Sequence, residues 1–111
     1  MREINNIGNE AAQDLTFVRD DGDIIINLKF LPLVQIWVMS VTFGDKSING
    51  IKLSTGVLHC RARNFPFDFI VVDNSGNGLD PFRSDDFSNG RCSLYLVEDE
   101  SMAVIRGQAV G

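Results

Sequence analysis

The sequence predicts an all-β domain, a small antiparallel barrel or sandwich with polar terminal arms. Short runs rich in β-branched and aromatic residues alternate with turns that contain Gly, Asn and Asp, which is typical of closely spaced strands. No stretch of useful length has the periodicity of a helix. The longest β-rich run, residues 34–43, reverses through residues 44–50 into a second apolar segment, residues 51–58. These segments predict an antiparallel platform with which the other strands pair.

Composition limits the domain count and the class of partner. A chain of 111 residues with 44% hydrophobic residues forms one domain with a real core. We divide it into an arm at 1–13, a β-domain at 14–106 and a tail at 107–111. The net charge of −5 disfavours nucleic acid or an anionic membrane as the main partner. No apolar run is long enough to cross a membrane, and the N-terminus lacks a signal core.

The first hairpin is predicted from residues 15–19 and 23–31. The connecting Asp20-Asp21-Gly22-Asp23 favours a tight turn, because Asp-Gly readily adopts positive φ. Pro32 ends the second strand, since proline has no N–H to donate to a ladder. The alternation places four apolar residues on one face of that strand, namely Ile24, Ile26, Leu28 and Phe30.

The run at residues 34–43 contains the only tryptophan, Trp37, and is apolar on both faces. Such a strand is covered on both sides, either by the rest of a barrel or by another chain. This pattern is a first indication of assembly, although a closed core and one loop would explain it equally well.

Two further strands are predicted at residues 67–73 and 91–97. A strong turn signal follows the first at residues 74–78, and a polar loop covers residues 79–90. The side chains expected to point inward are Phe67, Phe69 and Val71 in one strand and Cys92, Leu94 and Leu96 in the other.

The turn that starts at Asp73 partly matches a calcium-binding loop. The twelfth position is Ser84 where such a loop needs a bidentate Glu, and the flanking segments are predicted strands where it needs helices. A turn between strands is therefore the preferred interpretation. No cofactor and no metal are predicted.

Nucleophilic catalysis is difficult to build from this sequence. His59, the only histidine, precedes Cys60 in a strand-like stretch, so their side chains point to opposite faces. Only Cys92 could approach His59 through the fold. We expect a structural histidine and two buried free thiols.

Paired carboxylates are the other candidate for catalysis. Asp80, Asp85 and Asp86 lie in a polar loop, without the apolar setting that raises the pKa of a carboxyl group. A solvated loop or a salt-bridging interface is the plainer interpretation. The protein is predicted not to be an enzyme.

The order of these features resembles the small baseplate plug family of tailed bacteriophages, of the type described for a cyanophage baseplate. The resemblance covers residues 14–97, and its motifs are structural. The residues that match are Trp37, Gly50, Ile51, Leu53, Gly56, Leu58, Leu94 and Tyr95. Gly90 approximates the start of the last motif, with Asn89 where the family usually has Leu.

The resemblance implies a structural virion protein, made in the host cytoplasm and located in the tail baseplate. It would sit where the tail tube meets the hub and hold tube, hub and sheath-initiating proteins together in a contractile tail. A homo-oligomeric ring would bury edge strands that otherwise invite uncontrolled pairing.

The expected contacts are the arms at 1–13 and 98–111 and the loop at 79–90, which we expect to be ordered only in the assembly. An alternative is a monomeric binding module that recognises a peptide or carbohydrate through the same loop. The candidate interface residues are Asp80, Phe82, Arg83, Asp85, Asp86, Phe87, Arg61 and Arg63.

Overall fold

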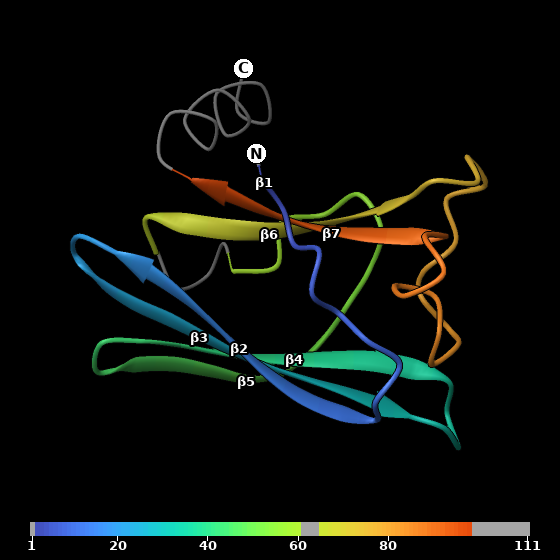
Figure 1. The fold of residues 1–111 in the computed structure, drawn as a ribbon, viewed down its shortest axis with the longest axis horizontal. Coiled ribbons are helices and arrows are strands. Elements are labelled where there is room, and N and C mark those ends of the chain that lie inside the picture. Colours follow the sequence, from blue (N-terminus) through green and yellow to red (C-terminus); the bar gives the residue numbers. More distant parts are fainter. Residues whose placement is uncertain (1, 61–64, 99–111) are drawn as a thin grey trace.

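The computed structural model describes residues 2–60 and 65–98 as two antiparallel sheets that lie face to face (Figure 1). The three-stranded sheet has the order β1-β7-β6, and the four-stranded sheet has the order β2-β3-β4-β5. The predicted all-β class is confirmed, in the form of a sandwich. The strands are β1 (Arg2–Glu3), β2 (Ala12–Arg19), β3 (Gly22–Leu31), β4 (Ile36–Phe43), β5 (Lys46–Lys52), β6 (Phe67–Asp73) and β7 (Cys92–Glu98).

The β2–β3 hairpin forms where the sequence predicts it. Arg19 pairs with Gly22, so the loop consists of Asp20 and Asp21 alone. The Asp-Gly pair had suggested a turn centred one residue later. Three of the four residues predicted for the inner face are fully buried, and Phe30 is half-buried; the buried three are Ile24, Ile26 and Leu28.

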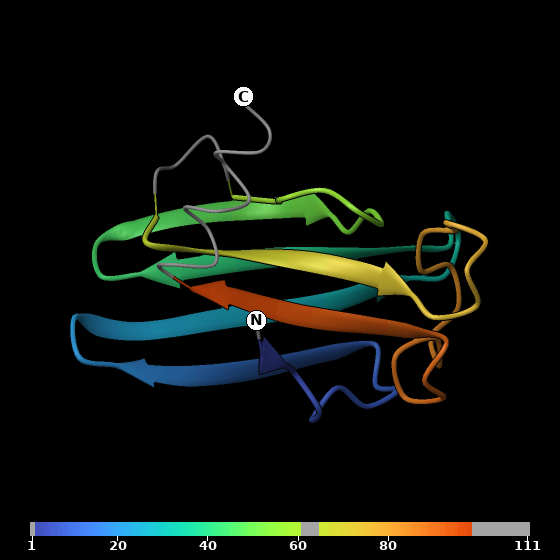
Figure 2. The same cartoon turned by 90° about the horizontal axis from the view of Figure 1, so that it is seen from above.

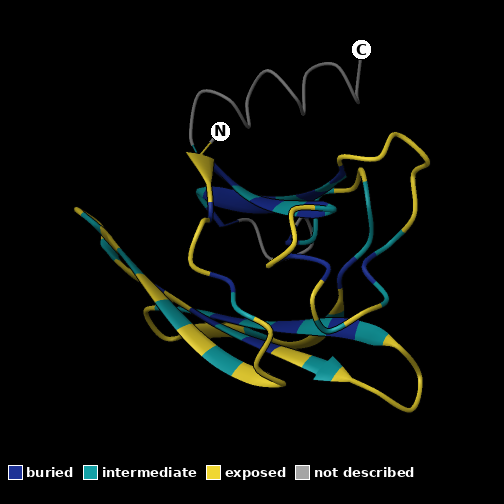
Figure 3. Cartoon of the chain, turned by 45° about the vertical axis from the view of Figure 1, so that its right-hand side comes forward, coloured by how far each residue is buried: buried dark blue, intermediate teal, exposed yellow. Residues whose placement is uncertain are grey.

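The inner face of β4 forms the centre of the core. Trp37, Met39 and Val41 are fully buried, whereas Ile36 and Val38 on the other face are half-buried. The two-sided cover expected for this strand is therefore not provided by the described residues. Burial alternates along β3 and β4 (Figure 3), and the residues on the outer face of these strands are half-buried or exposed.

A β-bulge interrupts the regular pairing of β4 with β5. The register shifts between Met39 and Val41, opposite Gly50, which has a φ of 68°. The Gly50 N–H donates to Ser40 Oγ at 3.2 Å. Glycine suits this position because a side chain would be strained at positive φ.

The three-stranded sheet has β7 at its centre. Its inward residues match the prediction, since Cys92, Leu94 and Leu96 are buried. The outer edge of β6 is covered by the segment that follows β5, where the Gly56 N–H donates to Val71 O at 2.9 Å.

Aromatic side chains join the two sheets. Phe65 and Phe67 stack with ring centroids 5.0 Å apart. Phe43, from the four-stranded sheet, packs edge-on against Phe67 at 5.2 Å, which is a favourable geometry for aromatic pairs.

The first residues of the chain belong to the sandwich. Ile4 and Ile7 are each 7% exposed, and the Ile4 N–H donates to Leu94 O at 2.8 Å. Segment 1–13, predicted as an arm, thus packs on the domain over its described part; its order in solution stays a prediction. The tail and nearly all of the second arm, residues 99–111, lie outside the described residues. Within the described ranges, no helix is long and apolar enough to span a membrane.

Candidate functional site

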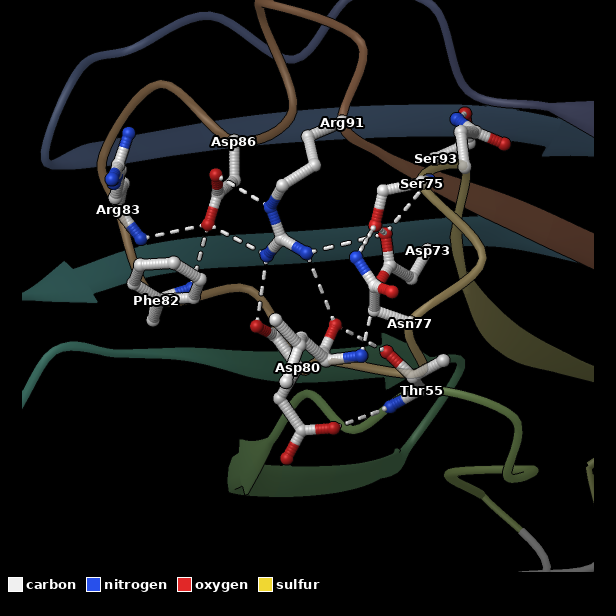
Figure 4. A network of polar contacts seen from close by, with 12 residues as sticks. Thr55, Asp73, Ser75, Asn77, Asp80, Phe82, Arg83, Asp86, Arg91 and Ser93 are labelled. Carbon is white, nitrogen blue, oxygen red and sulfur yellow. Dashed lines mark hydrogen bonds and ion pairs between the residues drawn. The ribbon is translucent and has the colours of Figure 1, made fainter.

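The loop between β6 and β7 is organised by one arginine (Figure 4). Arg91 Nε donates to Asp86 Oδ1, and its Nη2 donates to Asp86 Oδ2, each at 2.9 Å. Its Nη1 lies 3.3 Å from Asp73 Oδ1. The guanidinium therefore joins the end of β6 to the far end of the loop, in the bidentate geometry that strengthens such pairs.

The same guanidinium fixes the beginning of the loop. It donates to the carbonyl oxygens of Leu79 at 3.3 Å and Asp80 at 2.9 Å. Its central carbon lies 4.9 Å from the centre of the Phe82 ring, within the range of a cation–π contact. The five donors of arginine suit it to this bridging role.

Asp86 is a buried anchor for the loop. Its carboxylate accepts the backbone N–H of Phe82 at 2.7 Å and of Arg83 at 2.8 Å, and its side chain is 1% exposed. Burial opposes ionisation, but the hydrogen bonds from Arg91 and from the two N–H groups outweigh it. The pKa of Asp86 is therefore below its ordinary value, and the carboxylate serves the fold of its own chain.

Trp37 attaches the loop to the four-stranded sheet. Its Nε1 donates to Arg83 O at 2.9 Å, and Phe87 packs edge-on against the indole at 5.3 Å. Both ring systems are buried, with Trp37 0% and Phe87 9% exposed. The loop is thus held from both sheets, by Arg91 on one side and Trp37 on the other.

The segment after β5 makes a third attachment. The Thr55 N–H donates to Asp80 Oδ1 at 2.9 Å, and its hydroxyl donates to Leu79 O at 3.0 Å. Lys52 Nζ lies 3.4 Å from Asp80 Oδ2. The second apolar segment of the sequence, residues 51–58, therefore contacts the loop directly.

The turn that resembled a calcium loop is closed by its own hydrogen bonds. Asp73 Oδ1 accepts from the Ser75 hydroxyl at 2.6 Å and the Ser75 N–H at 2.9 Å, and Oδ2 accepts from the Leu79 N–H at 2.8 Å. Among the residues that the structure describes, no three His, Cys, Asp or Glu side chains form a metal-binding group. The geometry is that of an Asx turn.

His59 has a structural role in this fold. Its Nε2 accepts the Ser54 N–H at 2.9 Å, so the proton lies on Nδ1, which donates to Phe69 O at 2.9 Å. Burial, followed by the nearby Asp68 carboxylate, raises the pKa of the Cys60 thiol to about 12. Burial also raises the pKa of Cys92 to about 11. Both free thiols are buried, as predicted, and both are protonated near neutral pH, whereas the thiolate is the nucleophile.

Asp68 is a buried carboxylate that the sequence did not indicate. It is 0% exposed, and its Oδ1 accepts the N–H groups of Cys60 and Phe69 at 2.7 Å each. Strand alternation would have placed it on the solvent side. The N–H of Cys60 meets the carboxylate on that side, and local alternation carries no signal for such a contact.

The structure divides the predicted interface residues into three groups. Arg83 and Asp85 are exposed, Asp80 and Phe82 are half-buried, and Asp86 and Phe87 are buried. Arg61 and Arg63 lie outside the described residues. Arg91, which holds the loop together, was not among the predicted site residues.

A comparison with models of protein families identifies the family of this chain. The model of the cyanophage baseplate Pam3 plug gp18 matches residues 1–100. The chain belongs to this baseplate plug family. No curated protein matches it. As a member of the plug family, the chain is a structural protein of a phage tail baseplate, and this membership favours a non-enzymatic role.

The residues that suggested the plug family have structural roles here. Trp37, Leu53 and Leu94 are fully buried. Gly50 and Gly56 have φ angles of 68° and 79°, which favour glycine. The other matching residues are half-buried, namely Ile51, Leu58 and Tyr95.

Acid is expected to destabilise this member of the plug family through Asp73. The hydrogen bond from the Ser75 hydroxyl, with further help from the Leu79 N–H and Arg91, lowers the pKa of Asp73 from 3.8 to about 2. A lowered pKa in the folded state means that this stabilisation is present above the ordinary pKa and is lost as pH falls towards about 2. Urea unfolding at a series of pH values measures the effect.

The variant Asp73→Asn is expected to show a shallower decrease over the same pH range. Asp45→Asn, an exposed substitution in the turn between β4 and β5, is the matched control. An unchanged acid profile for Asp73→Asn would contradict the assignment.

Proposed function

We propose that this chain assembles at the junction of the baseplate hub and the tail tube of a contractile tail. There it holds tube, hub and sheath-initiating components together, as a homo-oligomeric ring. The observation that carries the proposal is the plug-family match over residues 1–100.

The internal anchoring of the 79–91 loop supports a role in assembly over one in ligand binding. Polar groups at the beginning, middle and end of this loop are engaged within the chain by Arg91, Asp86 and Trp37. A loop held in this way presents a fixed outer surface, to which Arg83 and Asp85 contribute. We propose these two side chains as contacts. No specific observation among the described residues favours the alternative, a monomeric module that binds a peptide or carbohydrate.

The hairpin tip between β3 and β4 is a second proposed contact. Leu33 is 98% exposed and Val34 is 62% exposed, next to Leu31 at 38%. Burying one such side chain contributes about 1.5–3 kcal/mol. Neighbouring exposed apolar side chains of this kind mark interaction sites in soluble proteins.

Deletion of the gene for this chain from its phage genome tests the proposal. Electron microscopy should show tails without a stable junction between tube and baseplate, and the intact gene supplied in trans should restore it. Parent virions that carry the chain only at the periphery of the baseplate, or deletion virions that keep their tube–hub junction, would contradict the proposed location.

The variant Leu33→Asp is expected to fail in this complementation. Its free energy of unfolding should stay within about 0.5 kcal/mol of the parent, because the side chain makes little contact within the chain. The matched control is Ser47→Asp, at another exposed position, on β5. Normal complementation by Leu33→Asp would remove the hairpin tip from the interface.

A further inference from the structure

Among the described strands, β2 is the long edge strand that is protected neither by a covering segment nor by a break in its register. Figure 2 shows β2 along one border of the four-stranded sheet and β5 along the other. β5 is protected by Lys46 and Lys52 at its ends and by the bulge at Gly50, which are common ways to prevent edge pairing. β2 has no lysine, no proline and an unbroken register over its eight residues.

The edges of the three-stranded sheet are covered or short. The segment after β5 lies along β6, where Thr55 bridges to Val71, and the opposite edge strand, β1, has only two residues. β2 is therefore an exception in a molecule that otherwise shields its edges. An uncovered regular edge invites pairing with another strand.

The hydrogen-bonding phase of β2 follows from its register with β3. The Phe30 N–H donates to Ala11 O at 2.8 Å, one step before the pair Ala12–Lys29. Hydrogen-bonded and non-hydrogen-bonded residue pairs alternate in an antiparallel ladder. Ala11 and Phe30 form a hydrogen-bonded pair, so Ala12 and every second residue after it belong to non-hydrogen-bonded pairs. The N–H and C=O groups of Asp14, Thr16 and Val18 therefore point away from β3, towards solvent, and these residues are exposed.

The charges around β2 indicate what kind of strand it accepts. Five carboxylates lie between residues 10 and 23, where Arg19 is the only Lys or Arg. Two cations from other segments lie beside β2, since Arg2 stacks over the Phe17 ring at 5.8 Å and Lys29 pairs with Ala12. The five carboxylates stand at both ends of the edge and are Glu10, Asp14, Asp20, Asp21 and Asp23. Such an arrangement favours a strand with basic residues at both of its ends.

A second copy of this chain fits the edge poorly. Antiparallel pairing of two β2 strands about Thr16 would place the Asp20–Asp21 loop of each copy beside Glu10 of the other. Like charges opposite one another destabilise a strand pair. The inner face of β2 carries the half-buried Leu15 and Phe17, so an added strand would need apolar side chains at alternate positions to continue the core.

We propose that β2 accepts an extended segment of a different baseplate protein, with an alternating apolar centre and Lys or Arg at both ends. The segment adds a fifth strand to the four-stranded sheet through the outward N–H and C=O groups of Asp14, Thr16 and Val18. This inference deepens the proposed function and rests on it for the source of the partner.

Binding of a designed strand to the full-length chain tests the proposal. The probe is the peptide acetyl-KRVTITVRK-amide, and its charge-reversed counterpart is acetyl-EDVTITVDE-amide. Hydrogen exchange followed by NMR should show slower exchange at the Asp14, Thr16 and Val18 amides with the basic probe only. Protection at β5, equal binding of both peptides or binding of neither would overturn the proposal.

The variant Thr16→Pro removes only an outward N–H, which an edge strand tolerates. It should weaken binding of the basic probe about tenfold or more, whereas Thr16→Val, which keeps the N–H, should bind normally. Dimerisation of the parent chain that Thr16→Pro abolishes would assign the edge to a second copy and overturn the proposed partner.

Purified baseplates separate this inference from the proposed function. A parent chain that is absent from the tube–hub junction contradicts the function, whatever the peptide does. A Thr16→Pro chain that enters baseplates as efficiently as the parent, at unchanged stability, overturns the role of β2 and leaves the function standing.

Discussion

Replacing Arg91 with Ala is expected to lower the free energy of unfolding by about 3–5 kcal/mol, because two buried carboxylates lose their cation. The side chains of Asp73 and Asp86 are each 1% exposed. The loop carbonyls of Leu79 and Asp80 lose a donor at the same time. Urea unfolding followed by the fluorescence of the single tryptophan measures the loss.

The matched control is Arg83→Ala in the same loop. Arg83 is exposed, and its guanidinium contacts only the Phe82 ring among the interactions described, at 5.2 Å from its centre. Its removal should cost less than about 1 kcal/mol. If the two variants lost similar stability, Arg91 would not be the organising residue. Faster hydrogen exchange across residues 79–90 in Arg91→Ala alone would localise the effect.

Replacing Trp37 with Ala is expected to cost about 3–5 kcal/mol, as for other buried aromatic residues. The side chain is 0% exposed and packs against Phe30 at 5.6 Å and Phe87 at 5.3 Å. The variant also leaves Arg83 O without its donor. Because Trp37 is the only tryptophan, circular dichroism must follow the unfolding.

Trp37→Phe separates packing from the hydrogen bond. It keeps an aromatic ring and loses the Nε1 donor, so it should cost clearly less than Trp37→Ala. A loss below about 1 kcal/mol for Trp37→Ala would contradict burial of this side chain. Equal losses for the two variants would assign most of the effect to the hydrogen bond with Arg83 O.

The strands and their inward faces were predictable because alternation is a local signal. Ile24, Ile26 and Leu28 alternate on β3, and the structure buries all three. The same reasoning failed for Asp68, which alternation assigns to the solvent side. Its carboxylate accepts the N–H of Cys60, eight residues earlier, and local alternation carries no signal for such a contact.

The candidate site was predictable only in part. The polar loop at 79–90 was identified from its composition, but its residues were all treated as available for contact. Asp86 and Phe87 prove to be buried, because Arg91, five residues after Asp86, and Trp37, on β4, draw them inward. Nothing in the spacing of these residues indicates such pairings.

The sequence by itself determined the all-β class, the positions of the main strands and, through Trp37 and the Gly50–Gly56 segment, the plug family. These properties depend on local alternation and on glycines at fixed positions. Only the tertiary structure decided that Arg91 joins Asp73 to Asp86, and that β2 keeps an open edge. Both depend on which strands become neighbours, and the burial of charge and the pairing of edges are properties of that arrangement.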